Sequence, residues 1–370
     1  MRWASAISDL PDLDAGLRAA LDHAADALEH HADLVMVFVS GHTSSLGDVP
    51  HRVRERFPRA HVLGCSAGGV LGGGLELEGR PGVAVTLASL PEVELVPFHL
   101  DDTDVRAVPR GDAFLLLADP LTVETPIVLE ALDTAHPEAT KVGGLSSGSP
   151  GAQVLWLDDA THGRGLAGLS LRGVVVDTIV AQGCRPVGEA MFVTRHRDHV
   201  IHELGGKPVV QVIRELFAAL PARDQESFRR SLFLGIGMDA DKREYRQGDF
   251  LVRNVGGVQR EGGGLVVGAT IDDWAVVQFH VRDAESSAHD LETLLSRHAA
   301  EGARPSGALL FSCLGRGQGL YGHPNHDSDA FHRVLGADIA LGGFFCNGEI
   351  GPVRGRTYLH GYTSSFALFR

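Results

Sequence analysis

The sequence predicts an α+β fold in which mixed parallel and antiparallel sheets are flanked by helices and the chain forms two related halves. Three times, an apolar run of strand length is followed by a helical pattern and then by a second strand pattern about 30 residues after the first, which is the spacing of a βαβ crossover. Other segments alternate apolar and polar residues, as half-buried antiparallel strands do. The 370 residues, 44% of them apolar and 22% charged, suffice for two globular domains.

The first of the three units follows an amphipathic helix. Leucine and alanine recur at helical spacing over residues 14–28. The continuous apolar run 34–39 is typical of a strand that is covered on both faces. A short helix near 51–57 and a strand at 61–63 follow, and this strand leads into the glycine-rich loop GCSAGG at 64–69.

The second unit repeats this order. A strand at 114–117 precedes a helix that starts at Thr125 and Pro126, since proline is favoured in the first helical turn. A strand at 141–142 then leads into the loop GGLSSG at 143–148.

The third unit carries the most polar loops. A strand at 308–311 leads into SCLGRG at 312–317, and a helix then runs through Leu335, with Asp327 or Ser328 as its candidate N-cap. A strand at 338–341 enters the segment LGGFFCNGEIGP, which combines glycines, aromatic side chains, a thiol, an amide and a carboxylate.

The segments between the units predict antiparallel strands joined by short turns. These strands are 83–87 with 93–99, a pair within 169–180, and a pair within 265–281. A helix that begins at Pro208 ends before Pro221, and the polar run behind it marks a domain junction. We therefore divide the chain into an N-terminal helix at 1–31, an N-terminal domain at 32–210 and a C-terminal domain at 211–370.

Composition excludes several classes of function. The net charge of −14, without any basic run, argues against nucleic acid or membrane partners. No leader and no long apolar segment are apparent, so we expect a cytoplasmic protein. The four cysteines show no C-x-x-C spacing, and the H-x-x-H at 323–326 lacks a second pair of ligands. We expect reduced thiols, no metal ion and no cofactor.

Two kinds of covalent catalysis stay open. Residues 64–68 and 144–148 both fit the G-x-S-x-G pattern of a serine nucleophile, but neither is followed by the helix which that pattern requires. A cysteine nucleophile could instead act with a nearby histidine. The alternative is thus a thiol- or serine-dependent hydrolase or transferase that uses Cys313 and Cys346, or Cys65 and Ser66.

We consider a ligand pocket the better hypothesis, because loops at the carboxyl ends of neighbouring parallel strands converge. Arg316 is suited to hold a carboxylate and Glu349 an amine, although Arg316 would serve equally as a local ion-pair partner of Asp327 or Glu349. The candidate ligand-binding residues are Cys65, Ser66, Gly68, Gly144, Ser146, Ser147, Cys313, Gly315, Arg316, Gly317, His326, Asp327, Phe345, Asn347, Gly348 and Glu349.

Several segments also resemble the FIST family over nearly the whole chain. They include GCSAGG at 64–69, GCRPVGEAMFVT at 183–194, FSCLGRGQGLYGHPNHDSDAF at 311–331 and GGFFCNGEIGPV at 342–353. The resemblance implies a FIST N-terminal and a FIST C-terminal domain, and a sensory role in signal transduction. It also implies a small polar ligand such as an amino acid or a derivative, and a separate signalling protein as partner. A protein-interaction scaffold is a further alternative.

Overall fold

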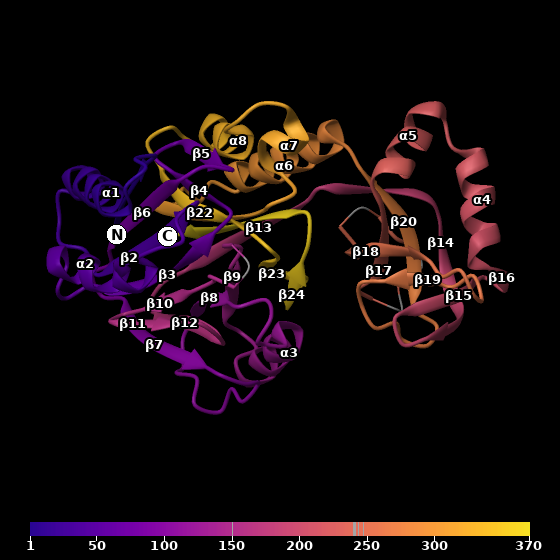
Figure 1. Ribbon diagram of the computed structural model, residues 1–370, viewed down its shortest axis with the longest axis horizontal. Coiled ribbons are helices and arrows are strands. Elements are labelled where there is room, and N and C mark those ends of the chain that lie inside the picture. The colour runs from indigo at the N-terminus through magenta and orange to yellow at the C-terminus, as the bar shows by residue number, and fades with distance from the viewer. Residues whose placement is uncertain (150, 240–241, 243, 247) are drawn as a thin grey trace. The chain divides into compact units, whose positions relative to one another are not determined.

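The structure is a computed structural model that describes residues 1–149, 151–239, 242, 244–246 and 248–370 (Figure 1). The chain divides into two compact units. One joins Met1–Ala181 to Leu291–Arg370, and the other is Gln182–Asp290. The first unit thus combines the beginning and the end of the chain, and the predicted boundary at residue 210 falls inside the second unit. Both units contain sheets with helices beside them, so the predicted α+β fold is confirmed.

The described part of the first unit contains three six-stranded sheets that share one plan. The first sheet has the order β1 (Arg2–Ser8), β6 (Gly82–Ser89), β2 (Leu34–Ser40), β3 (His61–Ala67), β10 (Leu155–Leu157) and β11 (Ala160–His162). The second has the order β7 (Glu94–Leu100), β12 (Leu166–Arg172), β8 (Ala113–Ala118), β9 (Thr140–Leu145), β23 (Glu349–Val353) and β24 (Arg356–His360). The third has the order β13 (Val176–Gln182), β25 (Thr363–Phe369), β21 (Gly307–Cys313), β22 (Ala340–Cys346), β4 (Gly69–Gly72) and β5 (Leu75–Glu78).

A parallel pair lies at the centre of each sheet. These pairs, β2 with β3, β8 with β9, and β21 with β22, are the three units predicted from the sequence. The hairpin at the end of each sheet comes from a different repeat. The β4–β5 hairpin follows β3 but extends the third sheet, β10–β11 follows β9 but extends the first, and β23–β24 follows β22 but extends the second. The three repeats therefore exchange their hairpins in a cycle.

The predicted pairing of neighbouring antiparallel strands is wrong. Strand β6 lies between β1 and β2, whereas β7 pairs with β12. Strands β12 and β13 belong to the second and third sheets, and β19 (Leu265–Val267) does not pair with β20 (Val276–Arg282). In the first unit the connections between these strands pass from one sheet to another, and in the second unit β17 and β18 separate β19 from β20 within one sheet. The alternation of apolar residues reveals neither arrangement.

Helices cover the outer faces of the sheets in the first unit. Helix α1 (Leu13–Leu28) buries Leu17, Ala20 and Leu21, and the side chain of Asp12 caps its first turn. The others are η1 (Leu46–Asp48), α2 (Val49–Arg56), α3 (Thr125–Ala135), α6 (Ala284–Ala300), α7 (Gly317–Tyr321) and α8 (His326–Leu335). Among the described residues, no helix has the length and apolar character needed to cross a membrane.

The described part of the second unit contains two complete helices, the beginning of α6 and a small barrel-like sheet. Its order is β14 (Cys184–Arg197), β20, β17 (Leu232–Gly237), β18 (Phe250–Val258), β19, β15 (Val200–Leu204) and β16 (Lys207–Pro208), and β14 also pairs with β15. Helix α4 (Val209–Ala219) is the predicted helix after Pro208. The polar run behind it forms a further helix, α5 (Ala222–Arg230), which buries Phe228 and is not a connecting loop.

Candidate functional site

A glycine occurs at the equivalent position in the second strand of each of the three parallel pairs. Gly64 lies opposite Val37, Gly143 opposite Leu116, and Gly343 opposite Leu310. A Cβ atom on these glycines would lie 2.0, 1.8 and 1.8 Å from the carbonyl oxygen of the opposite residue, so only glycine fits. The three strands that carry these glycines therefore reach their carboxyl ends with the same local geometry.

The loops that leave these strands meet one another, as the sequence predicts. The Ser147 amide donates to the Ser66 carbonyl (3.3 Å), and the Gly68 amide donates to Ser147 Oγ (2.9 Å). Ser147 Oγ in turn donates to the carbonyl of Phe345. Asn347 contacts the second loop twice, because its backbone amide donates to the Leu145 carbonyl (3.1 Å) and its side-chain amide donates to the Ser146 carbonyl (3.2 Å). We call residues 66–68, 145–148 and 345–348 the three-loop junction.

Glu349 distinguishes the third repeat from the other two. It is the first residue of its exchanged hairpin and pairs with Gly144, one residue after the shared glycine. The residues at the same register in the other sheets are Val70, opposite Phe344, and Leu155, opposite Cys65. Two of the three equivalent positions are therefore apolar, and the third carries an acid.

The carboxyl group of Glu349 is completely buried at the edge of the junction. One oxygen, Oε2, accepts a hydrogen bond from the Thr363 amide (3.1 Å), whereas Oε1 has no hydrogen-bond donor among the described residues. Burial raises the pKa of Glu349 to about 8, although contacts with Thr363, Arg316 and Cys313 oppose that rise. A buried oxygen without a partner needs a physical explanation, because such groups are rare in folded proteins.

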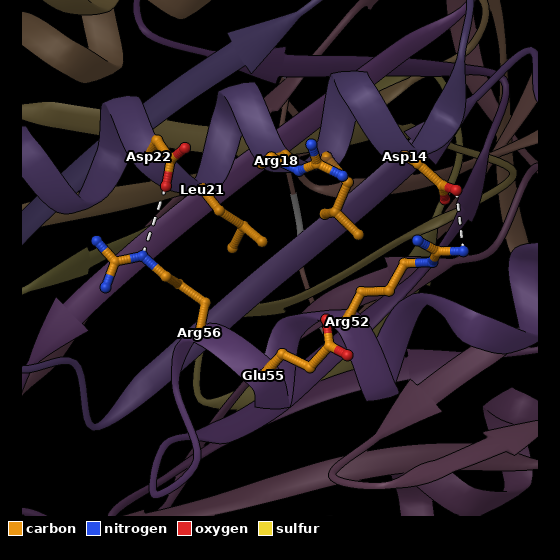
Figure 2. Close-up of a pocket in the computed structure, with 8 residues that line it drawn as sticks. Asp14, Arg18, Leu21, Asp22, Arg52, Glu55 and Arg56 are labelled. Carbon is orange, nitrogen blue, oxygen red and sulfur yellow. Dashed lines mark hydrogen bonds and ion pairs between the residues drawn. The ribbon is translucent and has the colours of Figure 1, made fainter.

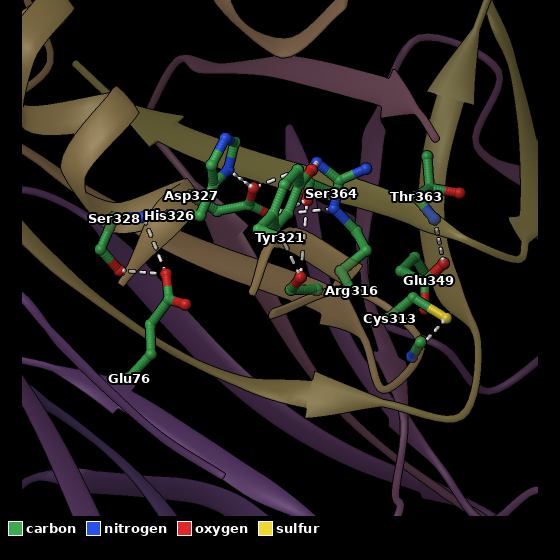
Figure 3. A network of polar contacts seen from close by, with 12 residues as sticks. Glu76, Cys313, Arg316, Tyr321, His326, Asp327, Ser328, Glu349, Thr363 and Ser364 are labelled. Atoms are coloured by element: carbon green, nitrogen blue, oxygen red, sulfur yellow. Dashed lines mark hydrogen bonds and ion pairs between the residues drawn. The ribbon is translucent and has the colours of Figure 1, made fainter. Parts of the chain in front are cut away.

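Arg316 is paired inside the protein (Figure 3). Its Nε lies 2.9 Å from Asp327 Oδ2, a second nitrogen lies 3.1 Å from Oδ1, and that nitrogen also donates to the Tyr321 hydroxyl (2.6 Å). Both members of the ion pair are buried. Of the two predicted roles for Arg316, the local ion pair with Asp327 is thus observed.

Asp327 is the centre of this polar network. It accepts further hydrogen bonds from Ser364 Oγ, from Ser312 Oγ (3.3 Å) and from His326 Nδ1 (2.9 Å). Burial alone would raise the pKa of Asp327, but Arg316 and these donors outweigh it and hold the pKa below its usual range. The group stays charged and fully hydrogen-bonded, so its role is structural.

Glu76 joins the first repeat to this network through the exchanged β4–β5 hairpin. Its Oε1 accepts hydrogen bonds from both the amide and the hydroxyl of Ser328 (2.8 Å each), in the first turn of α8. The predicted N-cap at Asp327 or Ser328 is therefore wrong: Asn325 holds that position without a side-chain cap, and Glu76 supplies the acceptor. Burial and the charge of Asp327 raise the pKa of Glu76 to about 8.

The two glycines that flank Arg316 make different contacts. Gly317 has a positive φ of 61°, and a side chain there would lie 2.3 Å from the carboxylate of Glu78, which accepts from the Gln318 amide (2.8 Å). The Gly315 amide faces the Cys313 sulfur at 3.5 Å. This loop is thus shaped by acids from the hairpin and does not have the backbone of a phosphate loop.

The chemistry of the thiols and of Ser66 does not favour the covalent alternatives. Burial raises the pKa of Cys65 and Cys346 well above the usual value, so these thiols stay protonated. Ser66 Oγ accepts from the Val154 amide (3.0 Å), and strand β4 rather than a helix follows its loop. Cys313 differs, because it is only half-buried.

Cavities elsewhere in the first unit do not involve the predicted residues. A groove between α1 and α2 has a volume of about 280 Å³ (Figure 2). The residues around it are Asp14, Leu17, Arg18, Leu21, Asp22, Arg52, Glu55 and Arg56. Two of its three arginines are engaged by acids, since Arg52 lies 2.9 Å from Asp14 and Arg56 lies 3.5 Å from Asp22.

The structure thus gathers the predicted site residues into two adjoining groups. The three-loop junction contains Ser66, Gly68, Ser146, Ser147, Phe345, Asn347 and Gly348, and the polar network around Asp327 contains Arg316 and His326. Cys313 and Glu349 contribute to both regions. Sequence reasoning missed Glu76, Glu78, Tyr321, Thr363 and Ser364. The alternation LELE in 75–78, which places both acids on one face of a strand, was the only available signal for the first two.

The family match covers both regions. The family model of the FIST N domain matches residues 33–207, and that of the FIST C domain matches residues 210–352. The chain belongs to the FIST family. An uncharacterized protein of Mycobacterium tuberculosis is 38% identical to this FIST protein over 384 residues, which cover 100% of both chains. An uncharacterized protein of Mycobacterium bovis is 34% identical over 382 residues, which cover 100% of this chain and 99% of the relative. Sensory and ligand-binding roles are general for FIST domains.

Proposed function

We propose that this FIST protein is a cytoplasmic sensor that binds a small polar ligand at the three-loop junction, with Glu349 as the main polar contact. The ligand is an amino acid or a derivative, and its amine donates to Glu349 Oε1. The signal then passes to a separate protein. The observation that carries this proposal is the pair of buried oxygens at the junction without partners among the described residues, Glu349 Oε1 and Ser146 Oγ.

The position of Glu349 supports this choice over Arg316. Arg316 already has a carboxylate partner in Asp327, so a ligand carboxylate would have to displace an internal ion pair. Glu349 Oε2 accepts a hydrogen bond from the Thr363 amide, and no donor to Oε1 is found among the described residues, so Oε1 can accept from a guest. In this proposal Arg316 and Asp327 position the third loop, and the remaining candidate residues shape the pocket.

Leu314 and Asn347 provide the route to the junction. Leu314 is 42% exposed, and its side chain packs against Gly68, where a Cβ atom would lie 2.6 Å from it. Asn347 is exposed and binds the second loop through its side chain. A displacement of these two side chains would expose the buried oxygens without unfolding a strand.

Thermal unfolding in the presence of amino acids, amines and other small metabolites tests the proposal. A ligand present at 100 times its dissociation constant stabilises the folded state by about 2.7 kcal/mol, which a melting curve detects. We expect Glu349→Gln and Asn347→Ala to lose the response, and Gln318→Ala, an exposed change outside the junction, to keep it. If no compound stabilises the protein, or if Glu349→Gln responds like the wild type, the proposal is wrong.

A further inference from the structure

Two cysteines end the central strands of the third repeat side by side. Cys313 is the last residue of β21 and Cys346 the last residue of β22, and they are register partners in the parallel pair. Neighbouring strands lie about 4.8 Å apart, inside the range of roughly 4.4–6.8 Å that Cα atoms of a disulfide span. Both residues are thiols in this structure.

The two thiols and Glu349 face the same space. Register partners point to one face of a sheet, and each thiol is close enough to affect the other, since Cys313 contributes to the raised pKa of Cys346. A Cβ atom on Gly144 would lie 2.4 Å from the sulfur of Cys346. Glu349 pairs with Gly144 and therefore points to that same side, where its carboxyl group lies close enough to the Cys313 thiol for Cys313 to affect the pKa of Glu349. Figure 3 draws both side chains.

The two thiols differ in their access to solvent. Cys346 is completely buried, whereas Cys313 is half-buried and precedes the exposed Leu314. A small oxidant therefore reaches Cys313 first. The protonated carboxyl group of Glu349 beside it can give a proton to a leaving group and take up the thiol proton in return, which lets the sulfur react as a thiolate.

We propose that Cys313 and Cys346 form an oxidation site for hydroperoxides, in which Cys313 reacts first and Cys346 closes a disulfide. The sulfur of Cys313 attacks an oxygen of hydrogen peroxide, so that an S–O bond forms and the O–O bond breaks. The protonated carboxyl group of Glu349 gives its proton to the leaving hydroxide, which departs as water, and takes up the Cys313 proton in return, so that Cys313 becomes a sulfenic acid. Both electrons come from the sulfur.

The second step consumes the sulfenic acid. The sulfur of Cys346 attacks the sulfur of Cys313, the S–S bond forms and the S–O bond breaks, and the hydroxide leaves as a second water with the Cys346 proton. In total, two thiols and one peroxide give one disulfide and two waters. A disulfide between adjacent parallel strands is strained, and strained disulfides are readily reduced, so the site is reversible.

Treatment of the full chain with hydrogen peroxide, followed by non-reducing peptide mapping, tests this assignment. We expect a cross-linked peptide that contains Cys313 and Cys346, and a fall from four titratable thiols to two in denaturant. The variant Cys346→Ser should accumulate a dimedone adduct at Cys313. Cys184→Ser, in the second unit, is the matched control and should form the same cross-link as the wild type.

A rate measurement tests the part played by the carboxyl group. We expect Glu349→Gln to slow the oxidation of Cys313 by about tenfold or more, because the carboxyl group that gives a proton to the leaving group and takes up the thiol proton is lost. The assignment is overturned if Cys65 or Cys184 reacts as fast as Cys313, if the disulfide forms only between chains, or if Cys313 proceeds to sulfinic acid while Cys346 stays reduced. The cross-link between Cys313 and Cys346 in the wild-type protein tests the assignment even if a variant fails to fold.

Discussion

The buried carboxyl group of Glu349 predicts an unusual pH dependence of stability. Its pKa rises from 4.5 to about 8 on folding, so the folded state holds its proton over a range in which the unfolded state has lost it. The stability that this group provides is complete below pH 4.5, falls as the pH rises toward 8, and is gone above pH 8. At about 1.36 kcal/mol per unit of pKa, the whole effect is about 5 kcal/mol, of which about 4 kcal/mol falls between pH 5 and pH 9.

The substitution Glu349→Gln isolates this effect, because glutamine has the shape of the protonated acid and does not titrate. We expect the free energy of unfolding of the variant, minus that of the wild type, to rise by about 4 kcal/mol from pH 5 to pH 9. Urea unfolding followed by tryptophan fluorescence is the assay. In a Trp274→Phe background, the two tryptophans that are left, Trp3 and Trp156, both lie in the first unit and report its unfolding alone.

A matched control is Glu138→Gln, which changes an exposed glutamate of the same unit and should leave the pH profile unchanged. Glu76→Gln should act like Glu349→Gln, because burial raises its pKa to about 8 as well. A difference between Glu349→Gln and the wild type that does not vary between pH 5 and pH 9 would show that Glu349 is ionised in the folded state, and the explanation of the site would fail.

Three further predictions concern other parts of the structure. Arg316→Met should destabilise the first unit by about 3–5 kcal/mol in urea unfolding, because it leaves Asp327 as a buried unpaired charge, and the second change Asp327→Leu should restore much of that loss. Gly143→Ala should abolish soluble expression, since its Cβ would lie 1.8 Å from the Leu116 carbonyl oxygen, whereas Gly163→Ala, with open space around it, should express normally. Burial lowers the pKa of His280 to about 4, so the stability that this neutral histidine provides is present above pH 6.5 and is lost as the pH falls toward 4. Hydrogen exchange should show the free energy of unfolding of the second unit falling by up to about 3 kcal/mol over that range, and His280→Phe should remove this loss.

The sequence predicts the local elements of this fold better than their pairing. The apolar runs 34–39, 114–117 and 308–311 identify the inner strand of each repeat, because strands that are covered on both faces have a continuous apolar pattern. Strand pairing depends on which edges lie open in three dimensions, and β6 and β7 lie in different sheets despite their adjacency, because β6 belongs to the first repeat and β7 to the second.

In the candidate site, too, the sequence predicts the local features better than their partners. The loops that carry Ser66, Ser147 and Asn347 meet as expected, since the carboxyl ends of parallel strands are fixed by the sheet. The partner of Arg316 was one of two predicted acids, and proximity in sequence does not choose between Asp327 and Glu349. Glu76 lies 251 positions before Asp327, and only the exchanged hairpin brings it to α8.

The cyclic exchange of hairpins makes the three sheets mutually dependent. A chain that lost the second repeat would also lose β10–β11 from the first sheet, and it would leave β23–β24 of the third repeat without a strand to pair with. Open strand edges invite aggregation, so no single repeat is expected to survive alone. An insertion that leaves the strand order of a sheet unchanged is tolerated, in contrast: the barrel-like second unit lies in the connection between β13 and β21, two strands of the same third sheet.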